Sequence, residues 1–127
     1  MAKITIVNLF GNKSISPGTA GTSDPIDLRY AANNGFFSLA HSVVAGTAGT
    51  VGTTVFTYVG CSTLDGTFIS PAASVAITTA GTAGTGGSAN ISTFEPEPMP
   101  FMKIIATQTG TAGAGKDSKV TAELIMQ

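Results

Sequence analysis

The sequence has little charge, one cysteine, one histidine and no tryptophan. Only 10% of its 127 residues are charged, against about 25% in an ordinary soluble domain. The net charge is −1 and Arg29 is the single arginine, so there is no basic cluster to displace the counterions of nucleic acid. The surface must therefore consist largely of Thr, Ser, Ala and Gly, which suits a protein packed in an assembly.

Long apolar runs and paired cysteines are also missing. No window approaches the roughly 20 apolar residues of a membrane span, and the opening MAKITIVNLF lacks the apolar core and cleavage site of a secretion signal. Cys61 has no second cysteine with which to form an internal disulfide, so stability does not depend on an oxidising compartment. We expect a protein made and folded in a cytoplasm, without a membrane partner.

Strand-forming sequence is abundant, and segment 53–69 (TTVFTYVGCSTLDGTFI) organises the expected fold. Residues 55–59 alternate with the period of two that is typical of a strand. Asp65-Gly66 then supplies a turn, because Gly accepts positive φ at little steric cost. Further strands are predicted at 3–9, 25–30, 36–45, 67–70, 74–79, 89–94, 101–108 and 118–127.

Turn residues separate these strands, and no helical spacing is sustained over ten residues. This pattern predicts an all-β fold, an antiparallel two-sheet β-sandwich of jelly-roll type, with an immunoglobulin-like sandwich as the alternative. The lack of tryptophan and of a cysteine pair removes the marks of a true immunoglobulin domain. We expect one domain, in which residues 25–127 form the sandwich.

Residues 1–24 are predicted to form an N-terminal strand followed by an extended arm or loop. Glycine and proline are too frequent between residues 10 and 24 for a regular element. The segment EPEPMP at 95–100 has three prolines, which remove backbone donors, so it is predicted to run as a connector along a sheet edge.

The tetrapeptide Gly-Thr-Ala-Gly occurs four times, starting at residues 18, 46, 81 and 110. A repeated loop that cradles phosphate or glycan is one interpretation. None of the four precedes a predicted helix, so the phosphate-binding mechanism is missing. Small-residue strand connections are the preferred interpretation.

No group of residues indicates a reaction centre. His41 lacks a nucleophile or acid partner in a recognisable pattern, and Cys61 lacks a metal or redox partner, so both are interpreted as structural. Two carboxylate pairs flank prolines, Asp24 with Asp27 and Glu95 with Glu97. They are interpreted as solvated turns, with inter-subunit salt bridges as the alternative, because the ligand density of a calcium loop is lacking. We predict no enzyme, no catalytic residue, no cofactor and no metal.

Three runs, FTYVGCSTLDGTFISP, FEPEPMPFMKIIATQTGT and VTAELIMQ, resemble small β-sandwich structural proteins of tailed bacteriophages. The matching residues are Tyr58, Gly60, Asp65, Gly66, Thr67, Phe68, Pro98, Pro100, Lys103, Ile104, Val120, Thr121, Ala122 and Leu124. Cys61 stands where that family has serine. The resemblance covers residues 53–127 and leaves residues 1–50 unmatched.

This resemblance implies a virion protein that decorates or cements the outside of a capsid, as a homotrimer bound to the major capsid protein. Removal of residues 1–24 would then leave a folded sandwich that no longer holds the particle. A receptor- or glycan-binding module of a tail tip or fibre is the first alternative, and a self-assembling surface filament is the second. The predicted contact residues lie in the arm and the connector: Lys3, Phe10, Lys13, Pro17, Asp24, Glu95, Pro96, Glu97, Pro98, Pro100 and Phe101.

Overall fold

The computed structural model describes residues 4–29, 37–44, 53–72, 76–80, 88–97, 99–110, 113 and 115–126. Within these ranges the regular elements are strands. They are β1 (Thr5–Ile15), β2 (Ala20–Thr22), β3 (Ile26–Asp27), β4 (Phe37–Val44), β5 (Thr54–Cys61), β6 (Thr78–Ala80), β7 (Ser88–Phe94), β8 (Phe101–Gln108) and β9 (Ser118–Met126).

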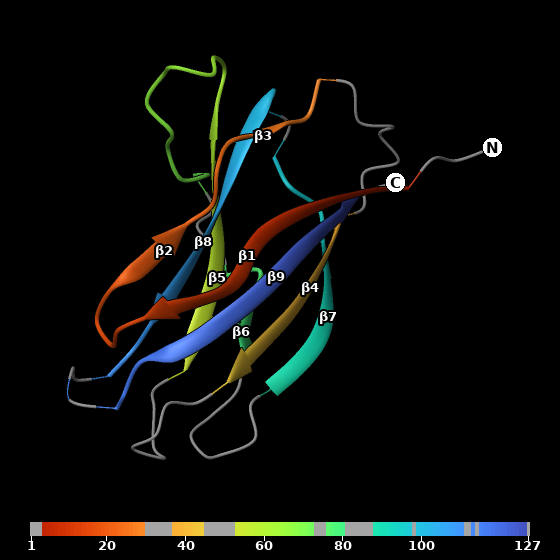
Figure 1. The fold of residues 1–127 in the computed structure, drawn as a ribbon. Coiled ribbons are helices and arrows are strands. Elements are labelled where there is room, and N and C mark those ends of the chain that lie inside the picture. The colour runs from red at the N-terminus through yellow and green to blue at the C-terminus, as the bar shows by residue number, and fades with distance from the viewer. Residues whose placement is uncertain are drawn as a thin grey trace.

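The strands form two antiparallel sheets that face each other (Figure 1). One sheet has the order β1-β9-β4-β7, and the other has the order β2-β8-β5-β6, with β3 also paired to β8. The predicted antiparallel two-sheet sandwich is confirmed. The central strand of the second sheet is β8, which pairs with β2, β3 and β5. The stretch at 53–69, expected from the sequence to organise the fold, supplies β5, a neighbour of the central strand β8.

The core lies between the sheets and follows the alternation of the strands. Every second residue of β9 from Ser118 to Met126 is buried, because successive side chains of a strand point to opposite faces. Phe56, Leu39 and Leu124 are completely buried. Burial of each such side chain stabilises the fold by about 1.5–3 kcal/mol.

Strand β1 is longer than predicted, because two irregularities absorb residues that usually end a strand. Its register against β9 shifts between Asn8 and Phe10 and again between Phe10 and Lys13. Asn12 takes a positive φ of 55°, and its N–H donates to Thr121 Oγ1 at 3.1 Å. A bulge of this kind adds a residue to one strand and lets the ladder continue.

The chain then crosses to the other sheet, where β2 and β3 lie along the same edge of β8. Between them, Ser23 exchanges hydrogen bonds with Ile104. The Ser23 N–H donates to the Ile104 carbonyl at 2.9 Å, and the Ser23 hydroxyl accepts from the Ile104 N–H at 2.9 Å. Pro25 is tolerated because an edge position needs no inner donor.

The extended arm or loop predicted over residues 10–24 is therefore wrong. This segment supplies strands to both sheets. We now expect that removal of residues 1–24 would unfold the sandwich rather than leave it intact.

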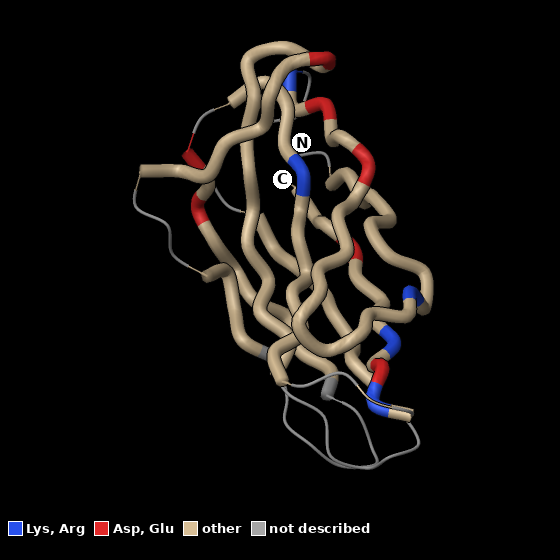
Figure 2. The backbone as a smooth tube through the Cα atoms, turned by 90° about the vertical axis from the view of Figure 1, so that its left-hand side faces the viewer, with Lys and Arg blue, Asp and Glu red and all other residues tan. Residues whose placement is uncertain are grey.

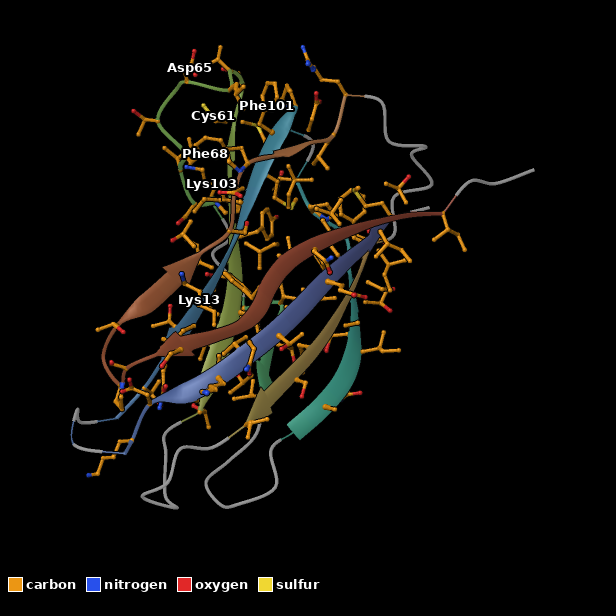
Figure 3. The ribbon with its side chains drawn as sticks, viewed as in Figure 1. Lys13, Cys61, Asp65, Phe68, Phe101 and Lys103 are labelled. Atoms are coloured by element: carbon orange, nitrogen blue, oxygen red, sulfur yellow. The ribbon has the colours of Figure 1, made fainter. Side chains whose placement is uncertain are left out.

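The loop after β5 folds back over the outer side of the second sheet. Gly66 has no room for a side chain, since an added Cβ would lie 2.5 Å from Cys61 Sγ. Phe68 receives the Lys103 ammonium 4.3 Å from its ring centroid (Figure 3). The strand predicted at 67–70 is reduced to one bridge between Gly60 and Ile69.

Other turns are only partly within the described ranges. The first Gly-Thr-Ala-Gly leads into β2, and Gly18, with φ of 79°, donates its N–H to the Gln108 carbonyl at 2.7 Å. That repeat is a strand connection, as interpreted. The repeats at 46–49 and 81–84 and the turn predicted at 33–35 lie outside the described residues.

Candidate interaction surface

Three of the predicted contact residues are buried, and their assignment as contacts is wrong. Phe10 is only 4% exposed and Phe101 only 6%, and Pro17 is also buried. Phe10 packs in the core because β1 continues through it. Phe101 lies beneath the Arg29 guanidinium, 5.0 Å from its ring centroid.

The remaining predicted contacts do not form one surface. Lys13, Asp24, Glu95 and Glu97 are exposed, whereas Pro96 and Pro100 are partly buried. Lys3 and Pro98 lie outside the described residues. Lys13 lies near the end of β1 that pairs with the start of β9, while Glu97 is joined to Tyr58 near the opposite end of the sandwich. The arm and connector are therefore not a joint contact site.

A different surface stands out, which we call the outer face: the solvent side of the sheet formed by β1, β9, β4 and β7. Four of its apolar side chains are strongly exposed, Ile4 by 60%, Ile6 by 61%, Val44 by 48% and Ile91 by 65%. The other outward residues of β4, β7 and β9 are Ser38, Ala40, Ser42, Ala89, Thr93, Lys119, Thr121, Glu123 and Ile125. Lys119 and Glu123 are thus the only charges on these three strands that face outward.

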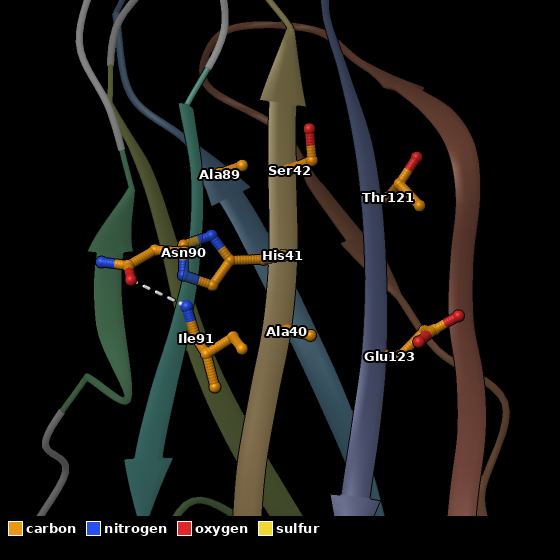
Figure 4. A pocket seen from close by; sticks show the side chains of 8 residues that line it. All are labelled: Ala40, His41, Ser42, Ala89, Asn90, Ile91, Thr121 and Glu123. Atoms are coloured by element: carbon orange, nitrogen blue, oxygen red, sulfur yellow. Dashed lines mark hydrogen bonds between the residues drawn. The ribbon is translucent and has the colours of Figure 1, made fainter.

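The outer face is hollowed over its middle by a shallow depression of about 570 Å³ (Figure 4). Small side chains, Ala40 and Ser42, lie along β4, while Ile91 of β7 and Glu123 of β9 stand on either side of Ala40. The Asn90 carboxamide oxygen accepts the Ile91 N–H at 2.8 Å, which occupies one backbone donor of β7. The surface over β4 is therefore lower than the side chains of Ile91 and Glu123 on either side of it.

His41 lies on the inner side of the same strand and is buried. It is 5% exposed and its ring lies 5.0 Å from that of Phe56. Its Nδ1 has no hydrogen-bond partner among the described residues, and its Nε2 is 3.5 Å from Ser92 Oγ. Burial lowers the pKa of His41 below its ordinary value, because the charged imidazolium is disfavoured away from water.

The other candidate chemical groups are also accounted for by structure. Cys61 is a buried free thiol, as interpreted from the sequence. Asp27 pairs with Arg29 at 2.8 Å, and the hydrogen bonds from the Arg29 side chain and backbone hold the pKa of Asp27 below its usual value. Among the described residues, no group of His, Cys, Asp and Glu is placed to hold a metal.

The fold defines a two-sheet β-sandwich, and known structures share it. Part of latent PorU from Porphyromonas gingivalis matches with a TM-score of 0.60 at 7% identity, covering 98% of this chain and 12% of that one. VP2 in the subviral particle of infectious bursal disease virus matches with a TM-score of 0.54 at 15% identity, covering 98% and 32%. The CBM22-1 xylan-binding domain of Xyn10C from Paenibacillus barcinonensis matches with a TM-score of 0.52 at 8% identity, covering 99% and 96%.

At these identities the likeness shows the fold alone. The chain spans 12% of the PorU chain and 32% of the VP2 chain. No protein-family model matches the sequence, and no curated protein matches it. In the part of the chain that is described, no helix has the length and hydropathy needed to cross a bilayer.

Proposed function

We propose that this protein is a decoration or cement protein that binds the capsid surface of a tailed bacteriophage through its outer face. The observation that carries the proposal is the set of exposed isoleucines, Ile4, Ile6 and Ile91, on a sheet face almost free of charge. Transfer of apolar surface out of water contributes about 25 cal/mol per Å². Few charges would have to be desolvated when such a face docks.

The proposed partner is the major capsid protein, and the proposed state is a homotrimer, as the sequence resemblance implies. A ligand that binds only the assembled lattice stabilises it by mass action. Three linked copies convert weak individual contacts into firm attachment, because the second and third contacts are intramolecular. No catalysis, cofactor or nucleic acid enters this mechanism.

The alternative of glycan binding has less support from the site. A sugar-binding platform needs an exposed aromatic ring. Tyr58, the tyrosine within the described residues, is half-buried and its ring packs 5.9 Å from that of Phe94, while Tyr30 lies outside them. A filament subunit would instead contact its neighbours end to end. The copy number in purified particles separates the filament from the capsid and tail alternatives.

The first test is the copy number of this protein in purified particles, measured by quantitative mass spectrometry against the major capsid protein. A ratio near that of an ordered shell component supports a cement protein. A few copies per particle would indicate a tail tip or fibre. Absence from particles would overturn both virion proposals and favour the filament.

The outer face itself is tested by Ile91→Lys, which places a charge on the apolar surface at its β7 edge. We expect this variant to fold normally, because Ile91 is 65% exposed, and to lose particle binding by about tenfold or more. Thr22→Lys adds the same charge at an exposed position of the other sheet and is the matched control. Equal binding by both variants in a co-sedimentation assay would contradict the assignment of the outer face.

A further inference from the structure

We infer that a second site, a cavity beside the connector at 95–100, binds the side chain of a lysine or arginine presented by a protein partner. We call it the connector cavity. Its volume is about 230 Å³, and it is lined by Tyr58, Gly60, Ile69, Ser70, Pro71, Ala72, Glu97 and Met99. It lies apart from the outer face, and the inference stands whether or not the protein joins a capsid.

Backbone contacts fix the walls of the connector cavity. Gly60 and Ile69 exchange two hydrogen bonds of 2.9 Å, from each N–H to the other carbonyl, which hold segment 69–72 beside β5. Gly60 also lets Met99 approach, since a Cβ at residue 60 would lie 2.7 Å from Met99 Cγ. A side chain at residue 60 would displace Met99 and change the cavity.

The carboxylate side of the connector cavity is positioned by Tyr58. The Tyr58 hydroxyl oxygen accepts the Glu97 N–H at 2.9 Å, and the Tyr58 ring packs on Phe94. The connector is therefore tied to β5 at Glu97, one of the residues that line the cavity. The Tyr58 O–H remains able to donate to a ligand.

Glu97 carries a negative charge that no cation of the described residues neutralises. Arg29 forms the ion pair with Asp27, and the Lys103 ammonium lies over Phe68. Lys13, which pairs with Val120, and Lys119, which pairs with Ser14, lie at the other end of the sandwich. A cation arriving from outside would therefore meet an unpaired carboxylate.

The rest of the lining matches the stem of a basic side chain. Ile69, Pro71, Ala72 and Met99 are apolar, and Ile69 is 62% exposed. Lysine and arginine bury their methylene stems along apolar surface while the charged head stays at a polar rim. Hydrogen bonds between such a head and a carboxylate are among the stronger contacts that proteins make. An anionic ligand would be repelled by Glu97.

The test is an NMR titration of the purified full-length protein with the peptides acetyl-Gly-Arg-Gly-amide and acetyl-Gly-norleucine-Gly-amide. We expect the arginine peptide to shift the backbone amide signals of Gly60, Ile69 and Glu97, and the neutral norleucine peptide to bind about tenfold more weakly or less. Glu97→Gln should lower the affinity for arginine by a similar factor. Glu95→Gln, on the same exposed connector but outside the cavity lining, is the matched control.

Three results would overturn the inference: no shifts with the arginine peptide at millimolar concentration, equal binding of the norleucine peptide, or equal losses in Glu97→Gln and Glu95→Gln. Xylose is titrated in parallel, and xylose binding that survives Glu97→Gln would reassign the cavity to sugars. Tyr58→Phe keeps the ring but removes the acceptor for the Glu97 N–H, and we expect it to weaken arginine binding. Since the assay contains no particle, its outcome is independent of the capsid proposal.

Discussion

At the residue scale, His41 makes the stability of the sandwich depend on pH. The neutral ring packs against Phe56, and its Nδ1 meets no hydrogen-bonding group in the part of the chain that the structure describes. Because burial lowers its pKa from the ordinary 6.5, the unfolded chain binds more protons than the folded chain once the pH falls below that value. The free energy of unfolding should therefore fall as the pH drops below 6.5 and level off below the pKa of the folded state.

Urea denaturation at a series of pH values between about 5 and 7.5 measures this effect. His41 is the only histidine of the chain, so no other imidazole titrates in that window. His41→Leu should remove the slope. The pKa of Asp27 is lowered from 3.8, so its contribution is lost only at more acidic pH. A slope that persists in His41→Leu would show that another group is responsible.

Gln108 closes the end of the core with a buried polar network. Its carboxamide nitrogen donates to the Lys116 carbonyl at 3.0 Å, and its oxygen accepts the Ser118 N–H at 3.2 Å and the Ser118 hydroxyl. Gln108→Leu would leave these groups buried without partners. We expect a loss of about 1–3 kcal/mol in the free energy of unfolding.

The matched control for Gln108 is its neighbour Thr107, which points to the other side of β8 and is only half-buried. Thr107→Val should change the free energy of unfolding by less than about 0.5 kcal/mol. Chemical denaturation of both variants makes the comparison. Equal stability of the two variants would mean that the Gln108 network contributes little.

At the element scale, β1 is held to the fold by its ladder with β9 and by Phe10. Phe10→Ala should lower the free energy of unfolding by about 3–5 kcal/mol, because it empties a core position. Asn8→Ala is the control, since Asn8 is exposed on the same strand. An unchanged denaturation midpoint in Phe10→Ala would restore the interpretation of this segment as a loose arm.

Alternation in the sequence was sufficient to predict the strands that became β4, β5, β8 and β9. Each has a nearly uninterrupted period of two, so the buried face can be read directly. It was not sufficient for residues 10–24, because Gly11 and Pro17 normally end strands. Here a bulge with a positive φ at Asn12 carries β1 past Gly11, and Pro17 lies in a turn short enough to let β2 follow directly.

The outer face could not be predicted from the sequence for a different reason. Ile6, Ala40 and Ile91 are separated along the chain, and they share a face only because β9 and β4 lie between β1 and β7. Strand order and register are set by packing of the whole sheet. The low charge of the chain indicated an assembly surface but not its place.

At the scale of the whole molecule, charges gather toward the two ends of the sandwich, whereas Glu123 lies beside Ala40 on the outer face between them (Figure 2). Lys13 and Lys119 lie where β1 ends and β9 begins, and Lys116 is nearby through the Gln108 network. Asp65 follows the end of β5, and Glu97 contacts Tyr58 of that strand. The outer face runs between these ends and is nearly neutral, so docking through it and docking through an end differ in their response to salt.

The response to salt therefore distinguishes docking through the outer face from docking through a charged end. Binding to particles through the outer face should be unchanged or strengthened when sodium chloride is raised from about 0.05 M to about 0.5 M, because salt screens exposed charge pairs but does not weaken apolar contacts. Co-sedimentation of the protein with particles at the two concentrations measures it. Ile91→Lys should remain defective at both. Release of the unmodified protein at the higher concentration would instead place the contact at a charged end, near Lys13 or Glu97, and would reject the outer face as the docking surface.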